Sequence, residues 1–269
     1  MGTTLEQGAM SIPATENALL ETRIAASQQE SWDDDPRWNE EQKLALACRI
    51  LGADGHDTVI PGLVLAHTAT PGAFLTLPIG LGFDEVTPSR LLTVDRELNV
   101  LRGRGKAPKA VGFLVKIAEM RPDIRCAIHT HALFTAALSM VGEPLAVSHM
   151  DATMFHDDCA YLKEWPGNPV TELEGEIIAG AIGRKHAVLL ANHGLATVGA
   201  SIEEAAYLAL CFDRAAKMQI RARAIASLVP LAPELAQDAH DYLTHPTMME
   251  VHFRRFARRA LRQDPRCLD

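Results

Sequence analysis

The sequence lacks three features that would each assign it to a class of protein. Its five cysteines are odd in number, widely spaced and without a CxxC pair, which argues against a disulfide framework. No apolar run approaches the ~18 residues of a membrane span, and no basic-then-apolar leader begins the chain. The chain also lacks a net positive charge. Its formal net charge of -8 argues against binding nucleic acid or anionic membranes. We therefore expect a cytoplasmic protein that acts on a small molecule.

What is present is an ordinary globular composition. Hydrophobic residues make up 48% and charged residues 22% of the 269 residues, enough for a sizeable core. Residues 1–35 are polar and predict an N-terminal arm, with one domain over residues 36–269. The basic stretch HFRRFARRALR at 252–262 indicates the polar face of a C-terminal helix, or a contact to an anionic substrate or partner subunit.

Helices and strands interleave along the predicted domain. Residues 39–55 predict an amphipathic helix with Leu44, Ala47, Cys48 and Leu51 on one face. Short strands are predicted at GLVLAH, AFLTLP, LLTVD and NVLRG, and longer buried ones at IRCAI and HAVLLA. Further helices are predicted at 108–121, 132–140, 171–182 (capped by Thr171) and 201–228, with a loop-rich stretch at 142–170. This alternation favours a single three-layer α/β domain.

The stretch RCAIHTHALF places His129 and His131 two residues apart at the end of an apolar run. Side chains alternate along a strand, so both imidazoles point to one face and can reach one ion. A second buried strand is followed by His193 and then Gly194, whose freedom permits a sharp turn. Three histidines leave an open coordination position, as in catalytic metal sites. We predict one divalent metal ion, either zinc, iron, manganese or cobalt, rather than three unrelated histidines.

The linked motifs resemble the class II aldolase/adducin family. RPDIRCAIHTHALFTAALS is followed about sixty residues later by LLANHGLATVG, and then by a long helix that begins with SIEEA. PIGLGFDEVTPSRLLTVDRELNV also resembles the family's segment before the helix, so the likeness runs from about Glu40 to Leu228. The resemblance implies an α/β/α domain around a mainly antiparallel sheet. It also implies a homotetramer with a metal near a subunit interface, held by His129, His131 and His193.

Two departures from the family pattern narrow the function. Family enzymes that act on sugar phosphates carry a glutamate base about nineteen residues before the first metal histidine. Here that position is Ala110, and no carboxylate lies between Lys106 and Lys116. The family's Gly-Asn-Val-Ser-like phosphate turn is replaced by PGLVLAH, in which Leu63 and Leu65 cannot donate hydrogen bonds. A flat, aromatic or otherwise non-phosphorylated substrate is therefore expected.

Candidate catalytic groups come from the stretch VSHMDATMFHDDCAYLKEW. The resemblance makes His149 the first candidate for an acid or base, Tyr161 the second and His156 the third; ordinary loop residues are the alternative. Substrate-binding candidates are His67, at the end of GLVLAH, and three cations that would face a second substrate carboxylate: Lys109, Arg254 and Arg255.

These residues favour a metal-dependent decarboxylase of a hydroxylated aromatic acid. One branch of the resembled family decarboxylates such compounds, and 3,4-dihydroxyphthalate is the most specific expectation, in aromatic catabolism. The first alternative is an aldolase or dehydratase for a small hydroxy-carbonyl compound, with a base from elsewhere in the fold. The second is a non-catalytic, adducin-like interaction protein, although adducin-like proteins have lost the metal ligands that are retained here.

Overall fold

The computed structural model describes residues 37–167 and 172–269. The predicted arm at 1–35 and the predicted cap Thr171 lie outside the described residues. Helices and strands over Trp38–Asp269 form one compact unit. Its strands are β1 (Leu63–His67), β2 (Phe74–Thr76), β3 (Leu92–Val94), β4 (Val100–Arg102), β5 (Cys126–Thr130), β6 (Cys159–Leu162), β7 (Ala187–Leu190) and β8 (Gly194–Gly199). Its α-helices are α2 (Glu40–Ala53), α3 (Gly112–Met120), α4 (Leu133–Ser139), α5 (Met150–Thr153), α6 (Glu172–Ile182), α7 (Ile202–Arg223), α8 (Pro233–Leu243) and α9 (Pro246–Gln263).

The strands form one sheet in the order β4-β3-β2-β1-β5-β8-β7-β6. All neighbouring pairs are antiparallel except β6 and β7, which are parallel. β5 therefore lies in the middle of the sheet, between β1 and β8. The predicted mainly antiparallel sheet is confirmed, and the histidine pair lies at the end of an interior strand.

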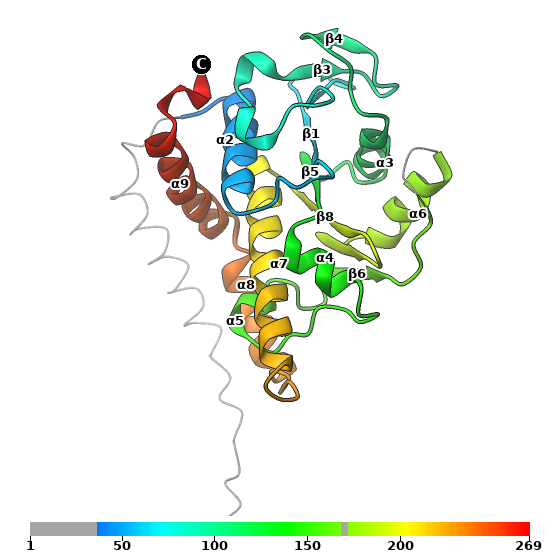
Figure 1. Cartoon of the computed structure of the whole chain (residues 1–269), viewed down its shortest axis with the longest axis vertical. Helices are drawn as coiled ribbons and strands as arrows, with labels where there is room; N and C mark the ends of the chain where they lie inside the picture. Colours follow the sequence, from blue (N-terminus) through cyan, green and yellow to red (C-terminus); the bar gives the residue numbers. More distant parts are fainter. Residues whose placement is uncertain (1–36, 168–171) are drawn as a thin grey trace, which may run out of the picture. The chain divides into compact units, whose positions relative to one another are not determined.

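Helices cover both faces of the sheet, which confirms the three-layer prediction. Val64 and Ile128 face the side covered by α2, α7 and α9. Their neighbours in sequence, Leu63 and Ala127, face the side covered by α3 and α6. Figure 1 shows these two groups of helices on opposite sides of the strands. The alternation of strand side chains thus divides the core into two layers.

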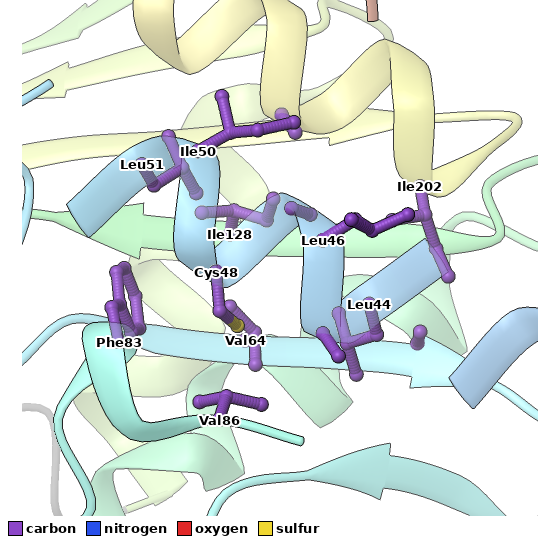
Figure 2. Packing of buried hydrophobic residues seen from close by; sticks show 14 of the residues in the cluster. Leu44, Leu46, Cys48, Ile50, Leu51, Val64, Phe83, Val86, Ile128 and Ile202 are labelled. Atoms are coloured by element: carbon purple, nitrogen blue, oxygen red, sulfur yellow. The ribbon is translucent and has the colours of Figure 1, made fainter. Parts of the chain in front are cut away.

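Helix α2 differs from the amphipathic helix expected. Beyond the predicted face of Leu44, Ala47, Cys48 and Leu51, its residues Ala45, Leu46 and Ile50 are buried as well. Figure 2 shows side chains of α2 between α7 above and β1 below, with Ile128 of β5 among them. Helix α9 and the short helix Pro265–Leu268 also contact α2. Tertiary contacts from distant parts of the chain therefore bury a wider surface than the sequence pattern indicates.

Two strands were not predicted from the sequence. β6 lies within the stretch predicted as loop-rich, and β8 follows directly after His193. The predicted long helix begins as expected, with Ser201 accepting a hydrogen bond from the Glu204 amide, but ends at Arg223 rather than 228. In the part of the chain that the structure describes, no helix is long and apolar enough to cross a membrane.

Candidate metal centre

The register of β5 divides its last residues between the two faces of the sheet. His129 is buried on the side of α3, where its ring meets Phe113 edge-on at a centroid distance of 5.1 Å. Thr130 points to the opposite face, and its Oγ1 lies 3.0 Å from Nδ1 of the buried His56. His131, just beyond the strand, returns to the face of His129, as the predicted spacing requires.

The hydrogen bonds of the two imidazoles identify their tautomers. Nδ1 of His129 lies 2.8 Å from the Leu195 carbonyl, and Nδ1 of His131 lies 3.3 Å from the Ile60 carbonyl. A carbonyl only accepts, so each Nδ1 carries the hydrogen and each Nε2 keeps a lone pair. The two Nε2 atoms face each other at 3.0 Å. Two lone pairs at this distance repel unless a cation lies beside both.

His193 completes the group from the turn between β7 and β8. Its ring centroid lies 4.8 Å from that of His129 and 5.0 Å from that of His131. Asn192 precedes it with φ 56, a left-handed conformation that asparagine tolerates. A Cβ on Gly194 would stand 2.5 Å from the Thr130 carbonyl, so only glycine permits the strands to approach here.

The donor atoms of the three histidines fit a single metal ion. One nitrogen from each ring lies within 4.8 Å of the other two. Two imidazole nitrogens on one tetrahedral ion at ~2.0–2.1 Å would be about 3.3 Å apart, close to the spacing of the facing pair. Buried Nδ1 of His193 has no hydrogen-bond partner among the described residues. The arrangement leaves a position open, as catalytic sites do.

Burial keeps all three imidazoles in the form that binds metal. Desolvation holds the pKa of His129 well below its usual range, and the neighbouring His131 and His193 add to the effect. Burial also lowers the pKa of His131, and lowers that of His193 to about 4. The rings are therefore neutral at neutral pH, with lone pairs available for coordination.

The three histidines lie in the wall of a cavity of about 720 Å³. Among its described lining residues none is Asp, Glu, Lys or Arg, and most are apolar. Leu63 and Ala110, where the family's phosphate donor and base would be expected, both line it. Leu65 does not, since it is buried in the core beside α3. The described lining thus offers no carboxylate for proton abstraction and no Lys or Arg for a phosphate.

The two predicted catalytic groups lie elsewhere in this chain. His149 caps α5, its half-exposed ring accepting a hydrogen bond from the Asp151 amide at 3.1 Å. Tyr161 lies on the edge strand β6 and packs against the core cluster around Phe212. Neither lines the cavity of the same chain. The third candidate, His156, is also absent from the lining.

The predicted substrate-binding residues are also outside this cavity. His67 lies at the end of β1 opposite to Leu63, the residue paired with His129, and its ring meets Phe74 at 4.8 Å. Lys109 is exposed between two lining residues without lining the cavity itself. Two arginines of α9 complete the set: Arg254 binds Glu250 and stands over the ring of Trp38, and Arg255 stands over that of Phe256.

Sequence reasoning missed an aromatic residue of the cavity lining that lies close to His193. Trp165 lines the cavity, with its ring centroid 6.1 Å from that of His193. It follows β6 in the stretch predicted as loop-rich, where a single aromatic carries no periodic signal. The carbonyls of Ile60 and Leu195 were also missed, because a backbone group leaves no mark in the sequence.

Comparison with known proteins identifies the family. The model of the Class II Aldolase and Adducin N-terminal domain matches residues 42–220, which include all three histidines. The chain therefore belongs to the class II aldolase/adducin family, as the linked histidine motifs predicted. Its fold is similar to that of an L-fuculose 1-phosphate aldolase from Glaciozyma antarctica, with a TM-score of 0.78, 24% identity and 97% of each chain covered.

Relatives in this family differ in the reaction they catalyse. Decarboxylase NovR of Streptomyces niveus is 28% identical over 60% of this chain and 60% of its own length. A 5-methylthioribulose-1-phosphate/5-deoxyribulose-1-phosphate aldolase of Rhodospirillum rubrum is 30% identical over 60% of this chain and 72% of its own length. Some homologues are thus decarboxylases and others aldolases, and class II aldolases are metal-dependent lyases.

Proposed function

We propose that His129, His131 and His193 bind one divalent metal ion and that the protein decarboxylates a hydroxylated aromatic acid, such as 3,4-dihydroxyphthalate. The observation that carries this proposal is the composition of the cavity. Three neutral imidazoles converge in a lining that otherwise has no ionisable side chain among the described residues. A role in aromatic catabolism in the cytoplasm follows as part of the proposal.

Decarboxylation suits this set of residues. The bond between ring and carboxylate breaks, its electron pair stays on the ring carbon, and that carbon takes up a proton as carbon dioxide leaves. No C–H proton has to be removed, so the absence of a carboxylate at Ala110 is no obstacle. When bound, the metal would supply Lewis-acid stabilisation of negative charge on the substrate. Leu63, Ala110 and Val111 supply apolar surface of the lining against which an aromatic ring can pack.

The proposed proton donor and substrate-binding cations would have to come from a second subunit. His149, Tyr161, Lys109, Arg254 and Arg255 do not line the cavity of their own chain. Any of them that acts on the substrate must be supplied by another copy in the proposed homotetramer. Loss of turnover in H149A or Y161F, together with rescue in hetero-oligomers mixed with H131A, would identify such a group.

Aldol cleavage is the second candidate, since a relative with that activity covers much of the chain. It requires a base, and the described lining residues offer no carboxylate for that purpose. An adducin-like, non-catalytic role is the third candidate. The converging histidines favour the metal-dependent candidates over it, and metal analysis of the purified protein separates them.

Metal analysis followed by a carbon dioxide release screen tests the proposal. Metal-loaded protein is incubated with 3,4-dihydroxyphthalate and other ortho-hydroxylated aromatic acids, and with unhydroxylated benzoate as the control substrate. We expect about one ion per chain and release only from the hydroxylated acids. H129A/H131A/H193A is the matched control protein and should release none. Retro-aldol turnover of a ribulose phosphate without carbon dioxide release would instead establish the second candidate.

A further inference from the structure

We propose that Trp165 forms the aromatic-recognition wall of the cavity and stacks on the planar ring of the ligand. This inference rests on the proposed function and names the residue that selects a flat aromatic acid over an open-chain sugar. The position of the side chain, its exposure and the uncharged cavity around it support the proposal.

The parallel pairing of β6 with β7 brings Trp165 to the histidines. Leu162, the last residue of β6, lies level with Leu190, the last residue of β7. The Ala191 amide donates to the Leu162 carbonyl at 3.0 Å, so the segment after β6 begins beside the turn that carries His193. Three residues later, the indole stands 6.1 Å from the His193 ring with an interplanar angle of 49°. The sheet thus fixes where this loop starts.

Trp165 is unusually open for a large aromatic side chain. Its exposed fraction is 49%, whereas the partly buried Trp38 packs against the core cluster of α2. Three other apolar side chains of the cavity lining, Ile60, Ile79 and Leu133, are also exposed. Exposed apolar surface that borders a cavity is typical of a ligand site.

The chemistry of the wall selects the class of ligand. An indole offers a π face with which a planar ring stacks, and aromatic pairs prefer centroid separations of about 4.5–7 Å. The Trp165 and His193 rings are already within that range. Because the indole lies near His193 and is half-exposed, a planar ring that binds beside the histidines can also meet Trp165. An open-chain hydroxy-carbonyl compound has no such ring, and the described lining offers no cation for a phosphate.

Ligand binding measured without turnover tests the inference. Wild type, W165L, W165F and W38F are compared, since W38F changes a tryptophan outside the cavity. Phthalate and 3,4-dihydroxybenzoate are the probes, titrated by tryptophan fluorescence and by calorimetry. We expect quenching in wild type and W38F and none in W165L. Affinity should fall about tenfold in W165L and less than threefold in W165F, because phenylalanine keeps a π face.

Two results would overturn the inference. One is equal affinity of wild type and W165L for both probes, with Tm values showing that both are folded. The other is a Trp165 emission that is shielded from acrylamide without ligand and becomes accessible on dilution to monomers, since a second copy would then cover the ring.

The failure of the inference and that of the proposed function are distinguishable. Aromatic binding that depends on Trp165, without carbon dioxide release from any acid, rejects the decarboxylase and keeps the aromatic wall. Carbon dioxide release by W165L with an unchanged KM rejects the wall and keeps the decarboxylase. Ribulose 5-phosphate serves as the open-chain control ligand, and its affinity should be the same in wild type and W165L.

Discussion

Nε2 of His129 and Nε2 of His131 face each other at 3.0 Å, and both rings donate through Nδ1 to backbone carbonyls. This geometry positions two lone pairs in the folded protein before any ion arrives. Metal binding should therefore stabilise the native state, because the unfolded chain does not hold the donors together.

Removal of the metal is predicted to lower the melting temperature. At a free metal concentration one hundred times Kd, binding contributes about 2.7 kcal/mol. For a chain of this size the corresponding decrease in Tm is about 5–10 °C. Differential scanning calorimetry with and without a chelator measures it. H129A/H131A/H193A should show no response, and an equal response in both proteins would refute the assignment.

Replacement of Gly194 by alanine is predicted to disrupt the centre. The added Cβ would meet the Thr130 carbonyl at 2.5 Å and the His131 ring at 3.0 Å. We expect a loss of about 1–3 kcal/mol in unfolding free energy together with weaker metal binding. G180A is the matched control, since nothing lies within 4 Å of a Cβ there, and it should stabilise helix α6 by about 0.5–1 kcal/mol. Normal metal binding by G194A would contradict the prediction.

The contact between His56 and Thr130 is predicted to support the metal ligands from behind the sheet. T130V removes the partner of a buried ring nitrogen and should cost about 1–3 kcal/mol of stability. Because Thr130 lies between two ligands, metal affinity should also fall about tenfold. T197V removes a comparable buried hydrogen bond, from Thr197 Oγ1 to the Ala205 carbonyl. T197V should lose stability while retaining metal affinity, which calorimetric titration can measure. Equal metal affinities of wild type and T130V would show that Thr130 does not position the histidines.

A carboxylate at position 110 is predicted to impair binding of aromatic acids. Ala110 lines a cavity without any charged described residue, so A110E places a negative charge beside the substrate carboxylate. We expect kcat/KM for hydroxylated aromatic acids to fall at least about tenfold, since like charges repel more strongly beside apolar surface than in bulk water. A110Q has nearly the same shape without the charge and should retain more activity. Equal losses in both variants would show that volume, not charge, is responsible.

The stabilising effect of His186 is predicted to depend on pH. Nδ1 of His186 donates a hydrogen bond to the Asp158 carboxylate, 2.7 Å away, and this raises the pKa of His186 above its usual value. This contribution is present below the unfolded pKa of about 6.5 and disappears as pH rises through the folded pKa. Urea unfolding of wild type and H186N should differ more at acidic than at alkaline pH. For H252N the trend should reverse, because burial lowers the pKa of His252; parallel pH profiles for the two variants would contradict the assignment.

The sequence predicted the elements that carry a clear apolar pattern and missed those that do not. β5, β7 and α7 were found because long apolar patterns mark them. β6 was missed because its residues, such as Tyr161, are half-buried on an edge strand and lack alternation. β8 was missed because it begins with Gly194 and is buried on both faces. The wide burial of α2 comes from distant elements such as α7 and α9, and no local pattern reports it.

The three histidines converge because short motifs at strand ends place them, so their meeting could be predicted locally. Which residues contact the substrate depends instead on strand direction and loop position, and short motifs do not report these. His67 was assigned to the site from the end of its strand, but β1 runs antiparallel to β5 and brings Leu63 to His129. The Ile60 carbonyl reaches His131 across 71 residues of chain. Such contacts follow from the tertiary fold alone.

The centre is divided between two parts of the chain that have different freedom to change. His129 and His193 depend on interior strands, where any shift would propagate through the sheet. Trp165 follows the edge strand β6, which has a neighbour on one side only. Replacement of the loop after β6 leaves the interior strands intact. Changes in this loop are therefore expected to alter ligand preference more readily than they alter the arrangement of the three histidines.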